Sequence, residues 1–508
     1  MRSKVARRSG VLLHPSSFPG PWGIGDLGAP ARAFIDFLGD SRQQLWQILP
    51  LGPTSDDGSP YSSFSSSAGN PLLISIDALV DEGLAVPASA PGTKPDSPVD
   101  AHAVGALKLP LLEQAASRFF KTDSPVRREF DQFAAERADW LDDYALFMAL
   151  RDAHPGTAWN RWPKALAQRE PQALADARAQ LQTRVSFHQF TQFVFFRQWS
   201  ALRDAAHNRG IRIVGDIPFY VAFDSVDVWA HPEYFALMPD TFEPRLMAGV
   251  PPDYFSATGQ LWGNPVYEWE HHSRRGFDWW VQRFRRLTHL VDVVRIDHFR
   301  GFQAFWQVPH GETTAINGSW APSPGDALFH TLELELGHLP VWAEDLGLIT
   351  PEVEKLRDDF DFPGMRVLQF GFDDKGAENP YLPFNFVENC VCYTGTHDND
   401  TTVGWWKSMS DAQRRQVLDY AGARDDREIN WTVIRLAMES IADTVVFPLQ
   451  DVLGLGSEAR MNVPGRADGN WSWRYDPAAL TGEIAARLRS ATTTFGRSPR
   501  FAMKKVGS

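Results

Sequence analysis

The amino-acid sequence predicts an α/β fold, a (β/α)8 TIM barrel with insertions after its second and third strands. Eight short apolar segments recur along the 508 residues, and most are separated by segments with helical spacing. A parallel barrel of this kind closes with eight strands, each followed by a helix. Three of the strands also end in an acidic residue. The predicted strands are residues 10–13, 44–51, 211–220, 291–299, 339–346, 365–370, 390–396 and 444–449.

The segments between these strands carry start and stop signals of helices. Pro30 falls in the first turn of one helix, and Thr350 and Pro351 provide the N-cap and first turn of another. The amphipathic segment 189–209 ends at Gly210, a common residue just past a helix. Further helices are predicted over residues 277–290, 327–336, 411–421, 429–442 and about 477–491.

Residues 70–184 depart from this alternating pattern. Pro-rich turns over residues 87–98 separate helical stretches, and no apolar strand interrupts them. We therefore expect an inserted, mainly helical subdomain at 70–184. The catalytic barrel is assigned to residues 1–69 and 185–508.

A second insertion, residues 223–276, follows the third predicted strand. Proline and glycine fix its backbone while Tyr254, Phe255 and Trp262 are displayed, which is typical of a lid over a site. The alternative is an Ω-loop packed on its own side chains. The lid is counted as part of the barrel domain.

Charge and hydropathy exclude several classes of function. The formal net charge is −13, which argues against a general nucleic-acid binder. The apolar runs are too short to span a bilayer. The basic N-terminal residues are not followed by the apolar segment of a secretory signal. We expect a cytoplasmic protein that binds neither membrane nor nucleic acid.

Motifs for metals, cofactors and redox chemistry are weak or missing from the sequence. The cysteines, Cys390 and Cys392, lie two apart on a predicted strand, which suits small core residues better than a disulfide. The segment 268–272 (EWEHH) is the best metal candidate, and we interpret it as solvated surface. No phosphate loop or dinucleotide motif is found. The sequence predicts no metal and no cofactor.

The segment 293–299 (VVRIDHF) is the strongest candidate for chemistry. Arg295 and Asp297 are two residues apart, so they point to the same face of a strand. The arginine favours the charged form of the aspartate, as a nucleophile requires. A structural ion pair inside a barrel is the alternative.

Carboxylates at the ends of three strands favour the catalytic interpretation. Asp297, Glu344 and Asp398 each come at or just after the end of an apolar run. In (β/α)8 barrels the chemistry lies at the carboxyl ends of the strands. These side chains are therefore expected to meet in one site.

Two carboxylates on either side of a glycosidic bond are the minimum for glycoside chemistry. We expect Asp297 to be ionised because Arg295 and His298 are its neighbours, and Glu344 to have a raised pKa on its apolar strand. Asp398 would balance positive charge at the transition state, and His397 would donate to the sugar. Asp345 is interpreted as loop charge.

Three segments resemble the catalytic blocks of the 4-α-glucanotransferases. These enzymes, also called amylomaltases or disproportionating enzymes, form glycoside hydrolase family 77 in the α-amylase clan. The segments are 295–301 (RIDHFRG), 343–347 (AEDLG) and 395–399 (GTHDN). Further blocks agree: 12–17 (LLHPSS), 58–61 (GSPY), 215–218 (GDIP), 249–262 and 462–465 (NVPG).

The resemblance implies a role for each residue of these blocks. Asp297 would be the nucleophile, Glu344 the acid/base and Asp398 the transition-state stabiliser of a retaining transfer. The implied partners are α-1,4-glucans: maltooligosaccharides, amylose and glycogen-derived dextrins. The implied substrate-binding residues are Tyr61, Asp216, Arg295, His298 and His397 around the cleaved bond, and Asp253, Tyr254, Phe255 and Trp262 in the lid.

Two other functions fit parts of the pattern. A plain α-glucan hydrolase would use the same carboxylates but pass the sugar to water. A glucan-binding protein without activity would not need Asp297, Glu344 and Asp398 together. Feeding maltotriose alone distinguishes transfer from hydrolysis, because transfer makes a ladder of longer oligomers.

Overall fold

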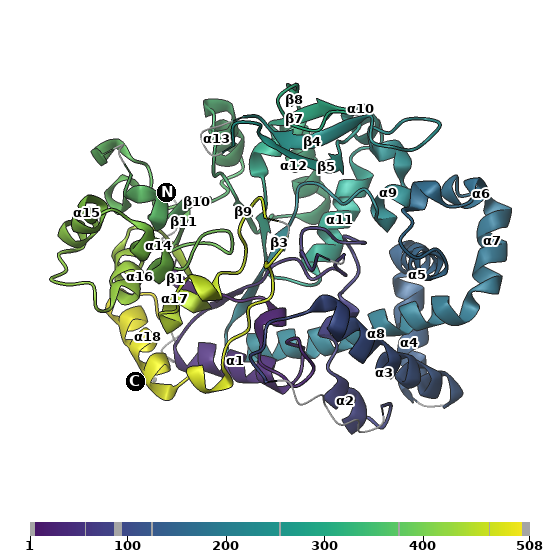
Figure 1. Ribbon diagram of the computed structural model, residues 1–508, viewed down its shortest axis with the longest axis horizontal. Coiled ribbons are helices and arrows are strands. Elements are labelled where there is room, and N and C mark those ends of the chain that lie inside the picture. Colours follow the sequence, from purple (N-terminus) through teal and green to yellow (C-terminus); the bar gives the residue numbers. More distant parts are fainter. Residues whose placement is uncertain are drawn as a thin grey trace, which may run out of the picture.

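The computed structural model describes residues 6–55, 57–85, 94–122, 125–252, 256–373, 376–466 and 468–499. Eight parallel strands form a closed barrel in the order β1-β12-β11-β10-β9-β6-β3-β2 (Figure 1). All eight predicted strands are present, and the predicted (β/α)8 class is confirmed. The strands are β1 (Arg8–Leu12), β2 (Leu45–Gln47), β3 (Arg212–Ile217), β6 (Val293–Ile296), β9 (Val341–Ala343), β10 (Gly364–Val367), β11 (Cys390–Tyr393) and β12 (Thr444–Pro448).

Alternation along the strands fills both faces of the barrel wall with apolar side chains. Leu12, Val214 and Met365 belong to the cluster inside the barrel. Cys390 and Cys392 lie on the other face, in the larger cluster beneath the helices. Both cysteines are buried and free, which agrees with their interpretation as small core residues.

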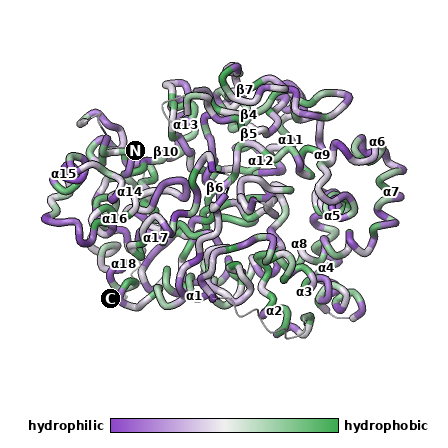
Figure 2. Tube along the Cα trace, viewed as in Figure 1, coloured by the Kyte–Doolittle hydropathy of each residue, from purple (hydrophilic) through white to green (hydrophobic). Residues whose placement is uncertain are grey.

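Helices follow the strands and cover the barrel. Hydrophobic and hydrophilic residues alternate along them in Figure 2, as expected of helices that bury one face. None of the helices in the described part of the chain is long and apolar enough to cross a membrane. The covering helices are α1 (Ala29–Asp40), α8 (Gln182–Asn208), α11 (Asp278–Thr288), α12 (Gly325–Leu336), α13 (Pro351–Asp359), α14 (Thr402–Ser408), α15 (Asp411–Ala421), α16 (Ile429–Glu439), α17 (Leu449–Leu453) and α18 (Gly482–Thr494).

The described part of residues 70–184 is helical. Its helices pack against α8, and the rings of Phe119 and Phe193 lie 6.0 Å apart across that contact. The separate domain at 70–184 stays a prediction. The helices are α2 (Ile76–Asp81), α3 (Ala101–Lys121), α4 (Pro125–Glu136), α5 (Ala138–Ala153), α6 (Lys164–Ala167) and α7 (Pro171–Gln180).

A second sheet corrects our interpretation of the lid and of the loop after the fourth barrel strand. β4 (Leu246–Val250) and β5 (Gln260–Pro265) lie in the lid, with the helices α9 (Val226–Ala230) and α10 (Trp269–Arg274). β7 (Ala304–Pro309) and β8 (Ser319–Pro322) come from a region that we expected to be a plain loop. The four strands pair antiparallel in the order β5-β4-β7-β8 (Figure 1). The barrel therefore has an insertion after its fourth strand as well, and the Ω-loop alternative is wrong.

The amino-terminal end of the barrel is closed by one buried arginine. Arg497 follows α18 and donates hydrogen bonds from all three guanidinium nitrogens. Nε bonds to the carbonyl of Met438, Nη1 to those of Arg8 and Asp443, and Nη2 to those of Ser440 and Ala442. The five donors of a guanidinium are thus all used. Burial lowers the pKa of Arg497 to about 9, so it stays charged at neutral pH.

Arg497→Ala should destabilise the fold by about 3–5 kcal/mol, because five hydrogen bonds to backbone carbonyls are lost. Arg497→Lys should recover only part of this, since an ammonium has three donors and no fork geometry. Chemical denaturation monitored by circular dichroism measures both. Arg489→Ala on the exposed face of α18 is the control. Equal stability of the Arg497 and Arg489 variants would contradict the closing role.

Candidate active site

The predicted catalytic residues lie at the carboxyl end of the barrel. Asp216 belongs to β3, Asp297 directly follows β6, and Glu344 directly follows β9. Asp398 comes five residues after β11. Because β6 lies between β3 and β9, the first three carboxylates come from adjacent strands.

Arg295 is the positive charge at the centre of the site. It pairs with Asp216 in the β3–β6 register, so both side chains point into the barrel. Its Nη1 lies 2.5 Å from Oδ2 of Asp216 and 3.1 Å from Oδ1 of Asp297. The arginine is 3% exposed, and burial strengthens its attraction to the two carboxylates.

Tyr61 and His397 extend this group from two loops. The Tyr61 hydroxyl donates to Oδ2 of Asp216 over 2.8 Å. It also lies 2.9 Å from Nε2 of His397, and the two rings stack with centroids 5.3 Å apart. The structure therefore brings Tyr61, Asp216, Arg295 and His397 together, as the resemblance implied.

Glu344 is held by backbone donors on both oxygens. Oε2 accepts from the N–H of His298 over 2.7 Å, and Oε1 accepts from the N–H of Leu346 over 2.9 Å. His298 has a left-handed backbone with φ of 54°, which is uncommon for a residue other than glycine. This conformation helps to direct its N–H at Glu344, so local strain supports the orientation of the carboxylate.

Asp398 is positioned by two residues that the sequence analysis did not single out for the site. Its Oδ1 accepts from Nδ2 of Asn462 over 2.6 Å, and Arg460 Nη2 donates to its carbonyl over 2.6 Å. The block 462–465 was a signal that could have identified Asn462. At 43% exposure, the side chain of Asp398 is the most open of the catalytic candidates.

Burial raises the proton affinity of the catalytic carboxylates, and for Asp297 this differs from our expectation that it is ionised. It raises the pKa of Asp297 well above its usual value. Arg295 opposes the rise, and the charges of Asp216 and Glu344 add to it. Burial also raises the pKa of Glu344, as predicted. Because Asp216 shares the one guanidinium, Arg295 does not hold Asp297 ionised in the way we expected.

His298 is a second correction. Burial lowers its pKa to about 4, so the imidazole is neutral at physiological pH. It cannot supply the positive charge that we expected beside Asp297. Its backbone N–H serves Glu344 instead, and its ring contacts Trp262 edge-on with centroids 5.0 Å apart.

Asp345, which we interpreted as loop charge, is buried. It is 4% exposed, pairs with Arg357 and Arg366, and accepts from the N–H of Met365. It ties the end of β9 to β10 and α13, and so fixes the segment that carries Glu344. In the EWEHH segment, His272 of α10 is buried, whereas the side chain of Glu270 is 90% exposed.

An open cleft of about 990 Å³ lies beside Asp297 and His298. Its walls carry the aromatic side chains of Tyr61, Tyr220 and Trp262, with Trp262 39% exposed. Aromatic faces with a few polar groups suit a sugar chain. Asp253, Tyr254 and Phe255 of the expected lid lie outside the described residues.

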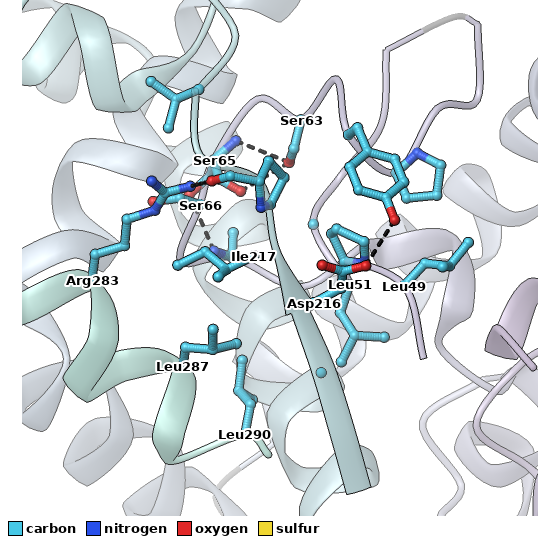
Figure 3. Close-up of a pocket in the computed structure, with 18 of the residues that line it drawn as sticks. Leu49, Leu51, Ser63, Ser65, Ser66, Asp216, Ile217, Arg283, Leu287 and Leu290 are labelled. Atoms are coloured by element: carbon cyan, nitrogen blue, oxygen red, sulfur yellow. Dashed lines mark hydrogen bonds between the residues drawn. The ribbon is translucent and has the colours of Figure 1, made fainter. Parts of the chain in front are cut away.

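A smaller cavity of about 60 Å³ lies next to β3. Figure 3 shows Arg283, Leu287 and Leu290 across this strand from Asp216. Neither Asp297 nor Glu344 is among its lining residues. Asp297 lines the open cleft instead, so a substrate in that cleft can reach the predicted nucleophile.

Comparison with known proteins shows the family to which the chain is similar. A family model described as 4-alpha-glucanotransferase matches residues 13–481. The chain belongs to this family. It is 53% identical over 499 residues to a 4-alpha-glucanotransferase of Synechocystis sp., covering 97% of this chain and 98% of the relative. It is 50% identical over 495 residues to that of Thermus thermophilus, covering 96% and 98%.

A solved structure supports the same assignment. The amylomaltase from Streptococcus agalactiae in complex with acarbose superposes with a TM-score of 0.94 at 40% identity, covering 97% of this chain and all of the other. The family likeness extends over nearly the whole chain. The enzyme is a 4-α-glucanotransferase, which moves α-1,4-glucan segments from a donor to the 4-hydroxyl of an acceptor.

Proposed function

We propose that Asp297, Glu344 and Asp398 perform this transfer by a retaining double displacement. The observation that carries the proposal is the placement of Asp297 and Glu344 on neighbouring strands. The two are linked through the His298 N–H that Glu344 accepts. Two carboxylates held at one strand edge can act on the two atoms of one glycosidic bond.

In the first step a carboxylate oxygen of Asp297 attacks C1 of the donor sugar. The bond from C1 to the leaving oxygen breaks, and the proton of Glu344 moves to that oxygen. In the second step the acceptor 4-hydroxyl gives its proton to Glu344 and attacks C1. The bond from C1 to Asp297 then breaks, and a new α-1,4 bond is made.

The proton for the first step comes from the pair of Asp297 and Glu344, because the pKa values of both carboxyl groups are raised. Two carboxylates beside one shared guanidinium cannot both stay charged without cost, so the pair retains a proton. Positive charge at C1 develops beside Asp297 and favours its ionised form. The proton is then left on Glu344, where the leaving oxygen needs it.

The remaining polar residues bind the sugar at the cleavage point. Asp398, fixed by Asn462, faces the open site and would accept from sugar hydroxyls and stabilise the oxocarbenium-like transition state. Tyr61, Asp216 and His397 would orient the same ring. The open cleft suits long chains, so we propose maltooligosaccharides, amylose and glycogen-derived dextrins as substrates.

A donor whose leaving group needs no proton distinguishes the role of Asp297 from that of Glu344. With α-maltotriosyl fluoride, Glu344→Gln should still form the bond to Asp297, because fluoride leaves without a general acid. The intermediate should accumulate and add the mass of one maltotriosyl unit in intact-protein mass spectrometry. Asp297→Asn should give no adduct. An adduct on Asp297→Asn, or one mapped to another residue, would overturn the assignment.

The lid is proposed to favour sugar acceptors over water. Trp262 lines the cleft beside His298, and Trp262→Ala should let water compete for the intermediate. With maltotriose as the sole substrate, transfer conserves reducing ends and hydrolysis creates them. We expect the ratio of new reducing ends to longer oligomers to be several-fold higher for Trp262→Ala than for the wild type. Trp320→Ala, on β8 of the same sheet, is the control, and an equal ratio in both variants would contradict the role of the lid.

A further inference from the structure

A small cavity lies beneath His397, where β1, β11 and β12 end. Its volume is about 20 Å³, which is room for roughly one water molecule. His14 borders it from the end of β1, and His397 borders it from the loop after β11. His14 and His397 are 7% and 6% exposed. His14 belongs to the block 12–17, to which the proposed mechanism gives no role. The other polar side chains that line it include Ser17, Asn399, Asp400, Thr401, Gln450 and Arg460.

The hydrogen-bond chain above the cavity fixes the tautomer of His397. Tyr61 has one hydroxyl hydrogen, and it donates this to Asp216, the carboxylate paired with Arg295. Nε2 of His397 must therefore donate to the Tyr61 oxygen 2.9 Å away. Burial lowers the pKa of His397, so the ring is neutral. Its Nδ1 then carries a lone pair and accepts.

His14 is also a neutral imidazole with its proton on Nε2. Its ring donates to the carbonyl of Leu49, and burial lowers its pKa to about 3. Among the described residues its Nδ1 has no hydrogen-bond partner, so Nε2 is the donor and Nδ1 the acceptor. The Nδ1 of His397 is likewise buried without a partner among them. Two histidines that border one cavity thus each have a buried acceptor without a partner among the described residues, and two acceptors cannot bond to each other.

We infer that His14 is a positioning residue for the transfer reaction, acting on His397 through a water molecule that donates to both Nδ1 atoms. A water has two hydrogens to give and fits the cavity. This bridge holds His397 as the Nε2–H tautomer and fixes the plane of its ring. His397 in turn orients Tyr61 and the sugar at the cleavage point. The inference rests on the proposed contact of His397 with that sugar.

The tautomer of His397 can be measured in the wild-type enzyme. Long-range ¹H–¹⁵N correlation spectra of ¹⁵N-histidine-labelled protein distinguish protonated from unprotonated ring nitrogens. His397→Gln and His14→Asn assign the two signals. We expect both rings to be neutral with the proton on Nε2. An Nδ1–H tautomer for either ring would overturn the inference, and no altered fold is needed for this test.

Paired substitutions at His14 test the consequence for catalysis. His14→Leu removes the acceptor, and we expect kcat to fall roughly tenfold to a hundredfold with little change in KM for maltotriose. His14→Asn places an amide oxygen near the position of Nδ1 and should recover most of kcat and restore the Nε2–H signal of His397. Equal kcat in the Leu and Asn variants would overturn the inference.

A matched control separates positioning from general damage to the core. His188→Leu removes another buried histidine, whose Nε2 bonds to Asp152 of α5, away from the cavity and the lid. It should lower the melting temperature and leave kcat within about twofold. If the His397 signal does not change in His14→Leu, the inference fails while the adduct assay on Asp297 and Glu344 still decides the proposed mechanism by itself.

Discussion

Asp297→Asn is expected to lower transfer activity by at least about 10⁴-fold while the fold is retained, because it removes the nucleophile. Asparagine keeps the shape of the side chain and can still accept from Arg295 at the end of β6. Initial rates with maltotriose and circular dichroism measure the two effects. Residual activity within tenfold of wild type would show that another group attacks C1.

The same substitution should stabilise the protein at neutral pH. The pKa of Asp297 is raised in the folded state, so its ionised form disfavours folding once the pH exceeds the unfolded value, about 3.9. Below that pH both states bind the proton and the cost is absent. Asparagine removes the charge, and we expect a gain of about 1 kcal/mol at pH 7. The gain is modest because the side chain is 30% exposed to the cleft.

Thermal unfolding of Asp297→Asn and wild type between pH 4 and pH 8 measures this difference. The melting temperatures should converge near pH 4 and separate as the pH rises. Asp326→Asn on the surface of α12, with a side chain that is 71% exposed, should show no comparable trend. A larger stabilisation at pH 4 than at pH 8 would mean that the burial argument has the wrong sign.

The barrel and its catalytic edge could be predicted because both follow from local patterns. Each barrel strand is a short apolar run, and parallel strands place their carboxyl ends on one side. Asp297 and Glu344 come directly after such runs, so their convergence needed only the topology. Tyr61 could not be placed in this way, because its loop has no period, and the resemblance assigned it to the cleavage point.

The features that were missed depend on pairing between distant segments. β7 and β8 are short strands that end in proline, and β4, the strand that pairs with β7, lies before the fourth barrel strand. Nothing local marks such strands. Asp345 was misjudged for a related reason, because its partner Arg357 comes from the helix that follows. The pKa of Asp297 depends on how four carboxylates share one arginine, which is a property of the assembled site.

Arg295→Met removes the guanidinium that these carboxylates share, and it should cost more stability than any other single substitution in the site. Without the guanidinium, the fully buried Asp216 and the partly buried Asp297 remain side by side with no cation, at an expected cost of about 3–5 kcal/mol. The pKa of Asp297 should rise further, because Arg295 is the group that opposes its rise. Less of the nucleophile is then ionised at pH 7, and kcat should fall at least about 10³-fold.

The dependence on pH identifies the cause of this loss. The stranded carboxylates disfavour folding only above their unfolded pKa, so the gap in melting temperature from wild type should widen from pH 4 to pH 8. Arg283→Met is the matched control. Arg283 is a buried arginine that donates to the carbonyls of Pro218 and Phe219, which do not titrate. Its loss should cost stability by a similar amount at every pH.

A double substitution then shows whether Arg295 acts through Asp297. If the guanidinium mainly offsets the charge on Asp297, adding Asp297→Asn to Arg295→Met should recover part of the lost stability at pH 8 and little at pH 4. Strict additivity at both pH values would mean that Arg295 stabilises the fold through Asp216 and packing alone. In that case the catalytic pair would not depend on this arginine for its protonation. The coupling therefore decides whether the buried β3–β6 ion pair tunes the nucleophile or only supports the barrel wall.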